Sequence, residues 1–330
     1  MNKILPVISL FILMNSFYYL MGQDPVMANF YAGKLNLNPA LAGTEGPATV
    51  SLGYRNQWPN SGSSYITYQA SYDQYIEKLH GGVGVKVMND KQGGGVFNYY
   101  NVDFIYNYQF RATRKLSLSG GLQAGFGQRS FDGSSLLFRD MFDPVTGNFT
   151  KVTQENTDRA PIFFPDFATG VFATYLNLYG GVSVHHLLRP VITQRSDPNG
   201  AIPRKYSLHA GALLPVIDKS IGHQIMLISP NFVFVQQADI QQINYGLDAI
   251  YNDLLVGLWV RHDMKFNYGN LIFSAGYQAV NWRLRYSYDI RLSSPQVQLP
   301  NMGAHEFTLV LIYRGSENRK GFGAIKCPKF

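Results

Sequence analysis

Ten charged residues stand at alternate positions in stretches whose other parity is apolar. Because they share one parity, they could interact with one another or with an ion. They are Arg55, Lys86, Asp103, Asp248, Arg261, Arg283, Arg285, Asp289, Arg291 and Glu306. If they share one enclosed lumen, two chemistries are open. Residues of opposite sign can pair and plug the lumen with a satisfied network, because unpaired charge away from water is costly. We favour this hypothesis because both signs occur together; the alternative is a wide aqueous path that selects anions.

Other constellations of residues do not indicate a catalytic or metal site. His185 and His186 are adjacent, so in a strand they point to opposite faces and cannot chelate one ion together. No serine stands in a Gly-x-Ser-x-Gly context. The glycine-rich stretches 81–84 and 120–127 are not followed by helical periodicity, so no helix N-terminus is available to hold a phosphate. We therefore expect no catalytic residue, metal or cofactor, and a protein that is not an enzyme.

The elements that must position the charged residues are β-strands. From Asn281 to Ser293, one parity holds Trp282, Leu284, Tyr286, Tyr288, Ile290 and Leu292, and the other holds Arg283, Arg285, Ser287, Asp289 and Arg291. A strand sends successive side chains to opposite sides, so this one has an apolar face and a charged face. The stretches 65–72, 98–110 and 242–251 repeat the alternation. Such segments, separated by turn residues, are typical of a transmembrane β-barrel.

Composition favours the same interpretation. The chain has 22 tyrosines and 22 phenylalanines, and outer-membrane barrels carry aromatic girdles at both membrane interfaces. The net charge is +7, but lysine and arginine are scattered and form no run. We interpret the basic residues as lumen charges and contacts to anionic lipid headgroups, and we expect no nucleic-acid partner.

The N-terminus predicts export. Residues 1–22 have a basic residue, Lys3, followed by an apolar stretch, as in a secretory signal peptide, with the mature chain beginning near Gln23. After Gln23 no apolar run is long enough for a transmembrane helix. We therefore predict an integral protein of the cell outer membrane, in which lipid covers the apolar strand faces. Cys327 is the only cysteine, so no intrachain disulfide can form.

Four segments are predicted along the chain. They are the signal peptide (1–22), a periplasmic or plug-like N-terminal segment (23–47), a β-barrel of about fourteen strands (48–314) and a basic C-terminal tail (315–330). The candidate strands include residues 115–130, 167–175, 205–214 and 223–236. The longest connections, 131–166 and 189–204, are expected to face outward and carry recognition. In the tail, the thiol of Cys327 is either incidental or pairs with a partner.

Several motifs resemble one known family. Gln23-Asp24-Pro25, Asn29-Phe30-Tyr31, the stretch from Leu37 to Gly43 (LNPALAG) and the stretch from Tyr54 to Trp58 (YRNQW) resemble the start of the PorP/SprF family of Bacteroidetes outer-membrane proteins. The stretches 257–261 (GLWVR) and 303–307 (GAHEF) and the closing Cys327-Pro328 are also similar to that family. The 131–166 connection matches nothing in it.

The resemblance implies a component of the type IX secretion system, which exports large proteins carrying a C-terminal sorting domain and, in gliding species, delivers surface adhesins. It also implies association with periplasmic ring and motor components through an adaptor lipoprotein or a peptidoglycan-binding protein. The hypothesis that follows is a receptor or anchor: the segment 23–43 and the short turns dock to the periplasmic machinery, and the long loops hold the cargo's sorting domain.

On this hypothesis Asn38, Pro39, Arg55, Trp58 and Arg261 are constrained positions. The simpler alternative is that Pro39 and Gly43 shape a turn and that Trp58 sits in an interface girdle. Three rival functions remain: an outer-membrane channel for small solutes or peptides, an outer-membrane enzyme, and a soluble secreted β-sandwich.

Overall fold

The computed structural model describes residues 24–59, 64–134, 136–144, 147–149, 153–154, 158–192, 200–218, 225–266, 269–292 and 303–313. The predicted signal peptide and the C-terminal tail with Cys327 lie outside these residues. Among them, no helix combines the length and apolar character needed to span a membrane.

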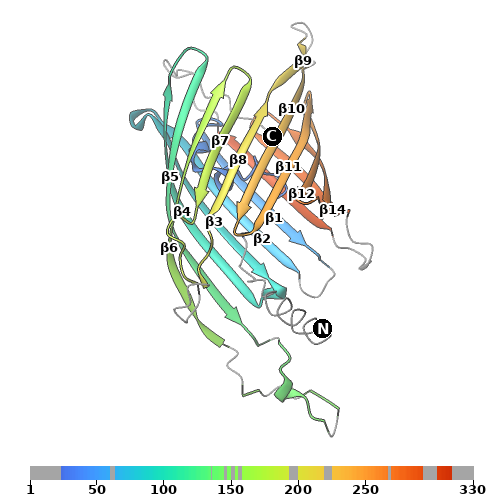
Figure 1. The fold of residues 1–330 in the computed structure, drawn as a ribbon. Helices are drawn as coiled ribbons and strands as arrows, with labels where there is room; N and C mark the ends of the chain where they lie inside the picture. Colours follow the sequence, from blue (N-terminus) through green and yellow to red (C-terminus); the bar gives the residue numbers. More distant parts are fainter. Residues whose placement is uncertain are drawn as a thin grey trace, which may run out of the picture.

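Antiparallel strands joined in chain order close into a barrel (Figure 1). The strands are β1 (Ala48–Gln57), β2 (Tyr65–Ile76), β3 (Gly81–Gln92), β4 (Phe97–Arg111), β5 (Leu116–Asp132), β6 (Asp158–Tyr175), β7 (Leu178–His185), β8 (Lys205–Ala212), β9 (Leu214–Asp218), β10 (Ile225–Gln237), β11 (Ile240–Tyr251), β12 (Leu254–Asp263), β13 (Gly269–Gln278), β14 (Trp282–Arg291) and β15 (Ala304–Tyr313). β1 pairs with both β2 and β15, which closes the ring. Because β8 and β9 are successive parts of one strand against β10, the barrel has 14 strands, and the predicted all-β barrel is confirmed.

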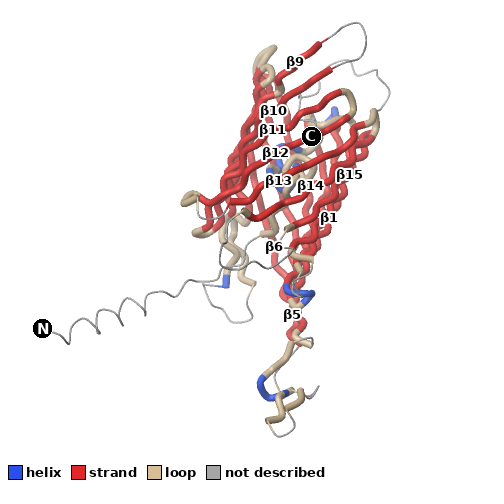
Figure 2. Tube along the Cα trace, turned by 90° about the vertical axis from the view of Figure 1, so that its right-hand side faces the viewer, coloured by secondary structure: helices blue, strands red, loops and turns tan. Residues whose placement is uncertain are grey.

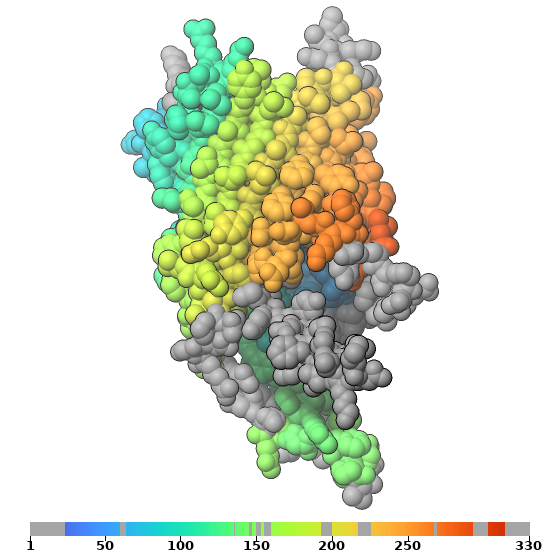
Figure 3. Space-filling model, viewed as in Figure 1, coloured from blue at the N-terminus to red at the C-terminus, as the bar shows by residue number. Residues whose placement is uncertain are grey.

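The connection between β5 and β6 is shorter than the sequence suggested, spanning 133–157 where we expected a loop over 131–166. β6 begins at Asp158, nine residues before the predicted strand start at Phe167. The part of β6 that the sequence did not predict contains Pro161 and Pro165, and proline within a run of residues usually argues against a strand. These prolines fit because β6 pairs with β7 only from Thr169 onward, so the preceding part is paired on one side alone. It projects from the barrel (Figures 2 and 3).

A second difference is the break between β8 and β9. We expected one strand over 205–214, but its partner β7 begins at Leu178, opposite Ala212. The backbone N–H of Leu213 then donates to the carbonyl of Asn177 in the β6–β7 turn, at 2.8 Å. The chain continues as β9 along β10 beyond that turn.

The barrel wall is apolar outside and polar inside. On β5 the outward residues Leu122 and Phe126 are 63% and 68% exposed, whereas the inward residue Gln123 is 4% exposed. This reverses the arrangement of a water-soluble protein. The outer face therefore requires lipid as its covering layer.

The two ends of the barrel differ in their connections. At one end the turns are short: 77–80, 112–115, 176–177, 252–253 and 279–281. At the other end lie the connections 133–157, 186–204 and 292–303. We call these the short-turn end and the long-loop end; in outer-membrane barrels short turns face the periplasm. β1 starts and β15 ends at the short-turn end, where Ala48 pairs with Tyr313.

Residues 24–47 run through the lumen from the long-loop end to the start of β1, and we call them the plug. The plug contains α2 (Lys34–Leu37) and the 3-10 turn η1 (Pro39–Leu41). Leu35, Ala40, Leu41 and Ala42 are fully buried. The expectation that segment 23–43 docks to periplasmic machinery is therefore wrong for residues 27–43, because the barrel wall encloses almost all of them.

Candidate functional site

Asn38 and Pro39 form the central contact of the plug. Asn38 is fully buried, and its Nδ2 donates to the carbonyls of Val171 on β6, at 3.0 Å, and Val182 on β7, at 3.2 Å. Its Oδ1 accepts the N–H of Ala40, at 2.9 Å, and so caps η1, in which Pro39 is the first residue. This turn places the backbone of the plug against the wall. The buried donors and acceptors of the turn find their hydrogen-bond partners there.

Glycines in the wall make room for this close approach. A Cβ at Gly121 would overlap the backbone of Pro39 and Ala40, and one at Gly82 would overlap the backbone of Ala42. A Cβ at Gly170 or Gly181 would collide with the Asn38 amide. Within the glycine-rich stretches of the sequence, Gly82 and Gly121 therefore make room for the plug.

Buried charges tie the other end of the plug to the wall. Lys34 Nζ lies 2.9 Å from Asp73 on β2 and 3.6 Å from Glu45 within the plug. The Glu45 carboxylate also accepts from Arg283 on β14, at 2.7 Å. The side chains of all four residues are 3% exposed or less, so each charge depends on its partners.

A second network joins the wall to the first part of the plug. The Glu306 carboxylate accepts the backbone N–H groups of Ala28, at 2.6 Å, and Asn29, at 2.8 Å. It also pairs with Arg55, at 3.2 Å. Arg55 and Arg261 share Asp289, at 3.0 Å and 2.8 Å. Arg261 Nη2 donates to the carbonyl of Met27, at 3.2 Å.

The remaining predicted lumen charges pair within the wall or lie at its end. Lys86 and Asp103 form an ion pair at 2.9 Å, and Arg285 pairs with Asp248. Arg291 is exposed and lies at the long-loop end. The structure thus brings nine of the ten charged residues into the lumen in four groups, two of which hold the plug.

The start of the plug is fixed by a cluster that we call the latch: Asp24, His186, Lys205 and Asp166. The Asp24 carboxylate lies 3.0 Å from His186 Nε2 and 2.5 Å from Lys205 Nζ, and Asp166 lies 2.9 Å from His186 Nδ1. Burial alone would raise the pKa of Asp24, but the charges of His186 and Lys205 hold it well below its usual range. Burial alone would lower the pKa of His186, but the carboxylates of Asp24 and Asp166 raise it to about 9.

The expectation that His185 and His186 point to opposite faces of a strand is wrong. β7 ends at His185, and His186 has φ 56°, so the chain turns there and both side chains are buried. Among the described residues, no group of three or more potential ligands is arranged to hold a metal ion.

A cavity of 1110 Å³ opens at the long-loop end above these networks, and we call it the mouth cavity. Its lining includes the aromatic residues Trp58, Tyr65, Phe97 and Phe131, the basic residues Arg55, Arg129, Arg261, Arg291 and His262, and the acidic residues Asp24, Asp90, Asp263 and Asp289. Trp58 has φ 57°, and its N–H donates to the carbonyl of Gly303, at 3.0 Å. A bulky residue with a positive φ is strained.

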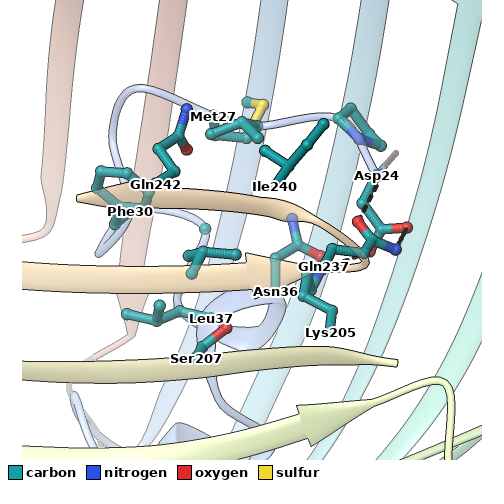
Figure 4. Close-up of a pocket in the computed structure, with 14 residues that line it drawn as sticks. Asp24, Met27, Phe30, Asn36, Leu37, Lys205, Ser207, Gln237, Ile240 and Gln242 are labelled. Carbon is teal, nitrogen blue, oxygen red and sulfur yellow. Dashed lines mark hydrogen bonds and ion pairs between the residues drawn. The ribbon is translucent and has the colours of Figure 1, made fainter. Parts of the chain in front are cut away.

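A smaller cavity of 80 Å³ lies between the plug and the wall, and we call it the side pocket (Figure 4). Phe30, Leu37 and Gln242 lie at one end, while Asp24, Lys205 and Gln237 gather at the other (Figure 4). Asp24, Pro25, Val26, Ile240 and Gln242 line both cavities, so the side pocket adjoins the mouth cavity.

Sequence reasoning identified the wall charges, but it missed their plug partners Glu45 and Lys34 and the latch residues Asp24, Asp166, His186 and Lys205. Their contacts join residues far apart in the chain: 181 positions separate Lys205 from Asp24. One signal was available in the sequence: Lys34 and Glu45 are charged residues in a segment that lacks the alternation of a strand. Their presence could have indicated that this segment pairs with the charges of the wall.

The closed ring of strands, its apolar outer face and its polar lumen define an integral outer-membrane β-barrel, as the sequence predicted. The sequence profile of the type IX secretion system membrane protein PorP/SprF family matches residues 20–311. The chain belongs to the PorP/SprF family, and the predicted resemblance is confirmed.

Solved outer-membrane barrels are similar in fold. The CymD monoaromatic hydrocarbon channel has a TM-score of 0.50 at 12% identity, covering 89% of this chain and 96% of its own. The Ralstonia pickettii toluene transporter TbuX has a TM-score of 0.49 at 12% identity, covering 88% and 95%. The Acinetobacter baumannii outer membrane protein Omp33 has a TM-score of 0.44 at 10% identity, covering 82% and 100%. No curated protein sequence matches the chain significantly.

Proposed function

We propose that this protein is a receptor and anchor of the type IX secretion system, which holds a segment of an exported cargo protein in the mouth cavity. The observation that carries the proposal is the combination of a lumen blocked by the plug and a cavity that opens at the long-loop end. Such a barrel offers a binding site on one side of the membrane and no wide path across it.

The blocked lumen disfavours a solute channel. At mid-height the plug residues Leu35, Asn38 and Leu41 are 0% exposed. Polar side chains of the wall bond to this segment: Ser119 on β5 donates to the carbonyl of Ala40 at 3.0 Å, and Ser183 on β7 donates to that of Leu37 at 2.6 Å. A channel would require all these contacts to break.

The lining of the mouth cavity favours a protein segment as its occupant. At 1110 Å³ the cavity exceeds the usual size of a small-molecule pocket, about 300–1,000 Å³. Tryptophan, tyrosine and arginine are the residues that most often dominate the binding energy of protein interfaces. Trp58, Tyr65 and Arg291 supply these types around the cavity. Charges of both signs allow a segment to be held in one register.

The short-turn end is then the surface for the periplasmic partners: the ring and motor components, through an adaptor lipoprotein or a peptidoglycan-binding protein. This end carries the five short turns and the hairpin of β9 and β10, which continues past the β6–β7 turn. The barrel would connect the two sides as a rigid body, since the plug ties β2, β6, β7 and β14 together.

Deletion of the gene in its native bacterium tests the proposal. Surface-exposed proteins would be biotinylated on intact cells and quantified by mass spectrometry, and at least one protein with a C-terminal sorting domain should be lost from the surface. If every such protein is still exported and attached at the wild-type level, the receptor proposal is wrong.

Charge reversals locate the site. Arg291→Glu and Arg129→Glu change the mouth cavity, and Arg111→Glu places the same change at the end of β4 near the short turns. We expect the first two to reduce surface cargo several-fold and the third to leave it attached, with equal amounts of heat-modifiable barrel in the outer membrane.

A further inference from the structure

The side pocket has the shape and polarity of a receptor for one side chain. Val235 on β10 and Gln242 on β11 are directly opposed in the sheet, and both line it. Phe30 and Leu37 of the plug cover it from the lumen side (Figure 4). The pocket therefore exists only while the plug is seated.

The size of the pocket selects its occupant. A volume of 80 Å³ is about half of the 150 Å³ cavity that accommodates benzene in an engineered protein interior. It suits the four carbons of a branched aliphatic side chain better than an aromatic ring. The walls formed by Met27, Phe30 and Leu37 are apolar and would exclude a charged group.

One side chain that lines the pocket has an unused hydrogen-bond acceptor. Gln242 Oε1 is buried and accepts no hydrogen bond from any residue in the described part of the chain. Because this oxygen has no accessible surface, the side-chain amide must rotate toward the pocket to meet a donor from an occupant. The new hydrogen bond would then remove the cost of a buried acceptor without a donor. A backbone N–H is such a donor, and it accompanies every side chain of an incoming peptide except proline.

We propose that the side pocket takes a leucine, isoleucine or valine side chain from the segment that the mouth cavity holds, with Gln242 accepting a hydrogen bond from the backbone N–H of that segment. The inference rests on the proposed function, because the pocket adjoins the mouth cavity and shares Asp24, Pro25, Val26, Ile240 and Gln242 with it. It adds the specificity: a partner segment anchored by one branched aliphatic residue.

Disulfide capture tests the pocket without knowledge of the partner. In a Cys327→Ser background, Ile240→Cys places a thiol at the rim of the pocket, and Asp239→Cys places one in the adjacent exposed turn as the control. Each detergent-solubilised protein would be equilibrated under partly reducing conditions with small disulfides bearing isobutyl, benzyl, hydroxyethyl or aminoethyl groups. Mass spectrometry then measures which group is retained.

We expect the isobutyl group to be retained at residue 240 roughly tenfold over hydroxyethyl, since each buried methylene contributes about fourfold. At residue 239 we expect no such preference. Equal retention of the isobutyl group at both positions, or a preference for a polar group at residue 240, would overturn the proposal. Stronger retention of the benzyl group would overturn the assignment to an aliphatic side chain.

Filling the pocket supplies the second variant. Ser207 lines it and is 5% exposed, so Ser207→Leu should occupy the space and abolish the isobutyl preference. If Ser207→Leu lowers the amount of heat-modifiable barrel, Val235→Phe fills the pocket from the neighbouring strand. A preference that survives in a folded, filled variant contradicts the proposal.

The same variants in the native bacterium separate this inference from the proposed function. Ser207→Leu should reduce the surface cargo that Arg291→Glu also reduces, and Arg111→Glu should not. If only Arg291→Glu releases cargo, the receptor function stands and the side-pocket anchor is wrong. If gene deletion releases none, the receptor function itself fails, whatever groups the pocket retains in detergent.

Discussion

Gly120 and Gly121 are neighbours on β5 with opposite surroundings. A Cβ at Gly121 would overlap the plug backbone at Pro39 and Ala40, while one at Gly120 would meet nothing within 4 Å. We predict that Gly121→Ala displaces the plug and destabilises the protein by about 1–3 kcal/mol, the usual cost of overpacking. Gly120→Ala should be close to neutral. Thermal unfolding in detergent, together with protease sensitivity near residue 39, measures both. Equal behaviour of the two variants would contradict the close approach.

Asp289 is the shared partner of two buried arginines, Arg55 and Arg261. We predict that Asp289→Asn destabilises the barrel by about 3–5 kcal/mol, because both largely buried guanidinium groups lose their common counter-charge. The matched control is Asp239→Asn, at an exposed turn position. The shift in the urea midpoint of heat-modifiable barrel measures the loss. A shift no larger than that of the control would show that water reaches this network.

For single residues, the sequence revealed wall partners of the ion pairs but not the plug partners. Alternation in β14 placed Arg283, Arg285 and Asp289 on one face, and the structure places all three in the lumen. Alternation gave no information on Glu45, the plug partner of Arg283. Residues 24–47 lie in no strand, and their contacts depend on how this segment passes through the barrel.

Among the elements, the plug is the least regular, and its first residues depend on the latch. The pKa of a histidine is ordinarily 6.5, and that of His186 is raised to about 9 in the folded protein. The stability that its charge gives to the latch is therefore complete below pH 6.5 and is lost as the pH rises through about 9. The pKa of Asp24 is lowered from 3.8, so its contribution is present above that value and is lost as the pH falls below it. We predict that the latch is strongest between these two limits.

A spin label at Pro25→Cys, in the Cys327→Ser background, reports on the latch because Pro25 follows Asp24 and lines the mouth cavity. Its mobility should increase from pH 6 to above pH 9. In His186→Asn, which cannot carry the charge, the mobility should be high and independent of pH over this range. A pH response that persists in His186→Asn would exclude the latch as its cause.

The strands show where alternation fails as a predictor of elements. Alternation correctly predicts a strand that pairs with a neighbour on each side and has one face in contact with lipid, as β14 does between β13 and β15. It fails on β6 before Thr169, where pairing with β5 alone tolerates Pro161 and Pro165. It also fails at Leu213, where the break depends on the length of a neighbouring hairpin rather than on local residues.

For the whole molecule, the direction of the barrel in the membrane determines which partners reach which end. We predict that the long-loop end faces outward. In the Cys327→Ser background, a membrane-impermeant maleimide on intact cells should label Leu137→Cys, in the exposed β5–β6 connection, but not Asn252→Cys, in a short turn. Both should react after the cells are broken. The opposite pattern would place the mouth cavity in the periplasm, where it could not hold a cargo at the surface.

The closed lumen gives a last prediction for the whole molecule. Because the plug fills the barrel and has only α2 and η1 as regular structure, it should unfold before the wall, whose strands are paired around the full ring. In planar bilayers we therefore expect no steady conductance in the absence of denaturant. In moderate urea a large conductance should appear, and it should disappear when the urea is removed. Gly121→Ala should open at lower urea than Gly120→Ala, because only the former weakens the seat of the plug. A large steady current from the untreated protein would mean that the plug leaves the lumen spontaneously, and the chain would then act as a channel.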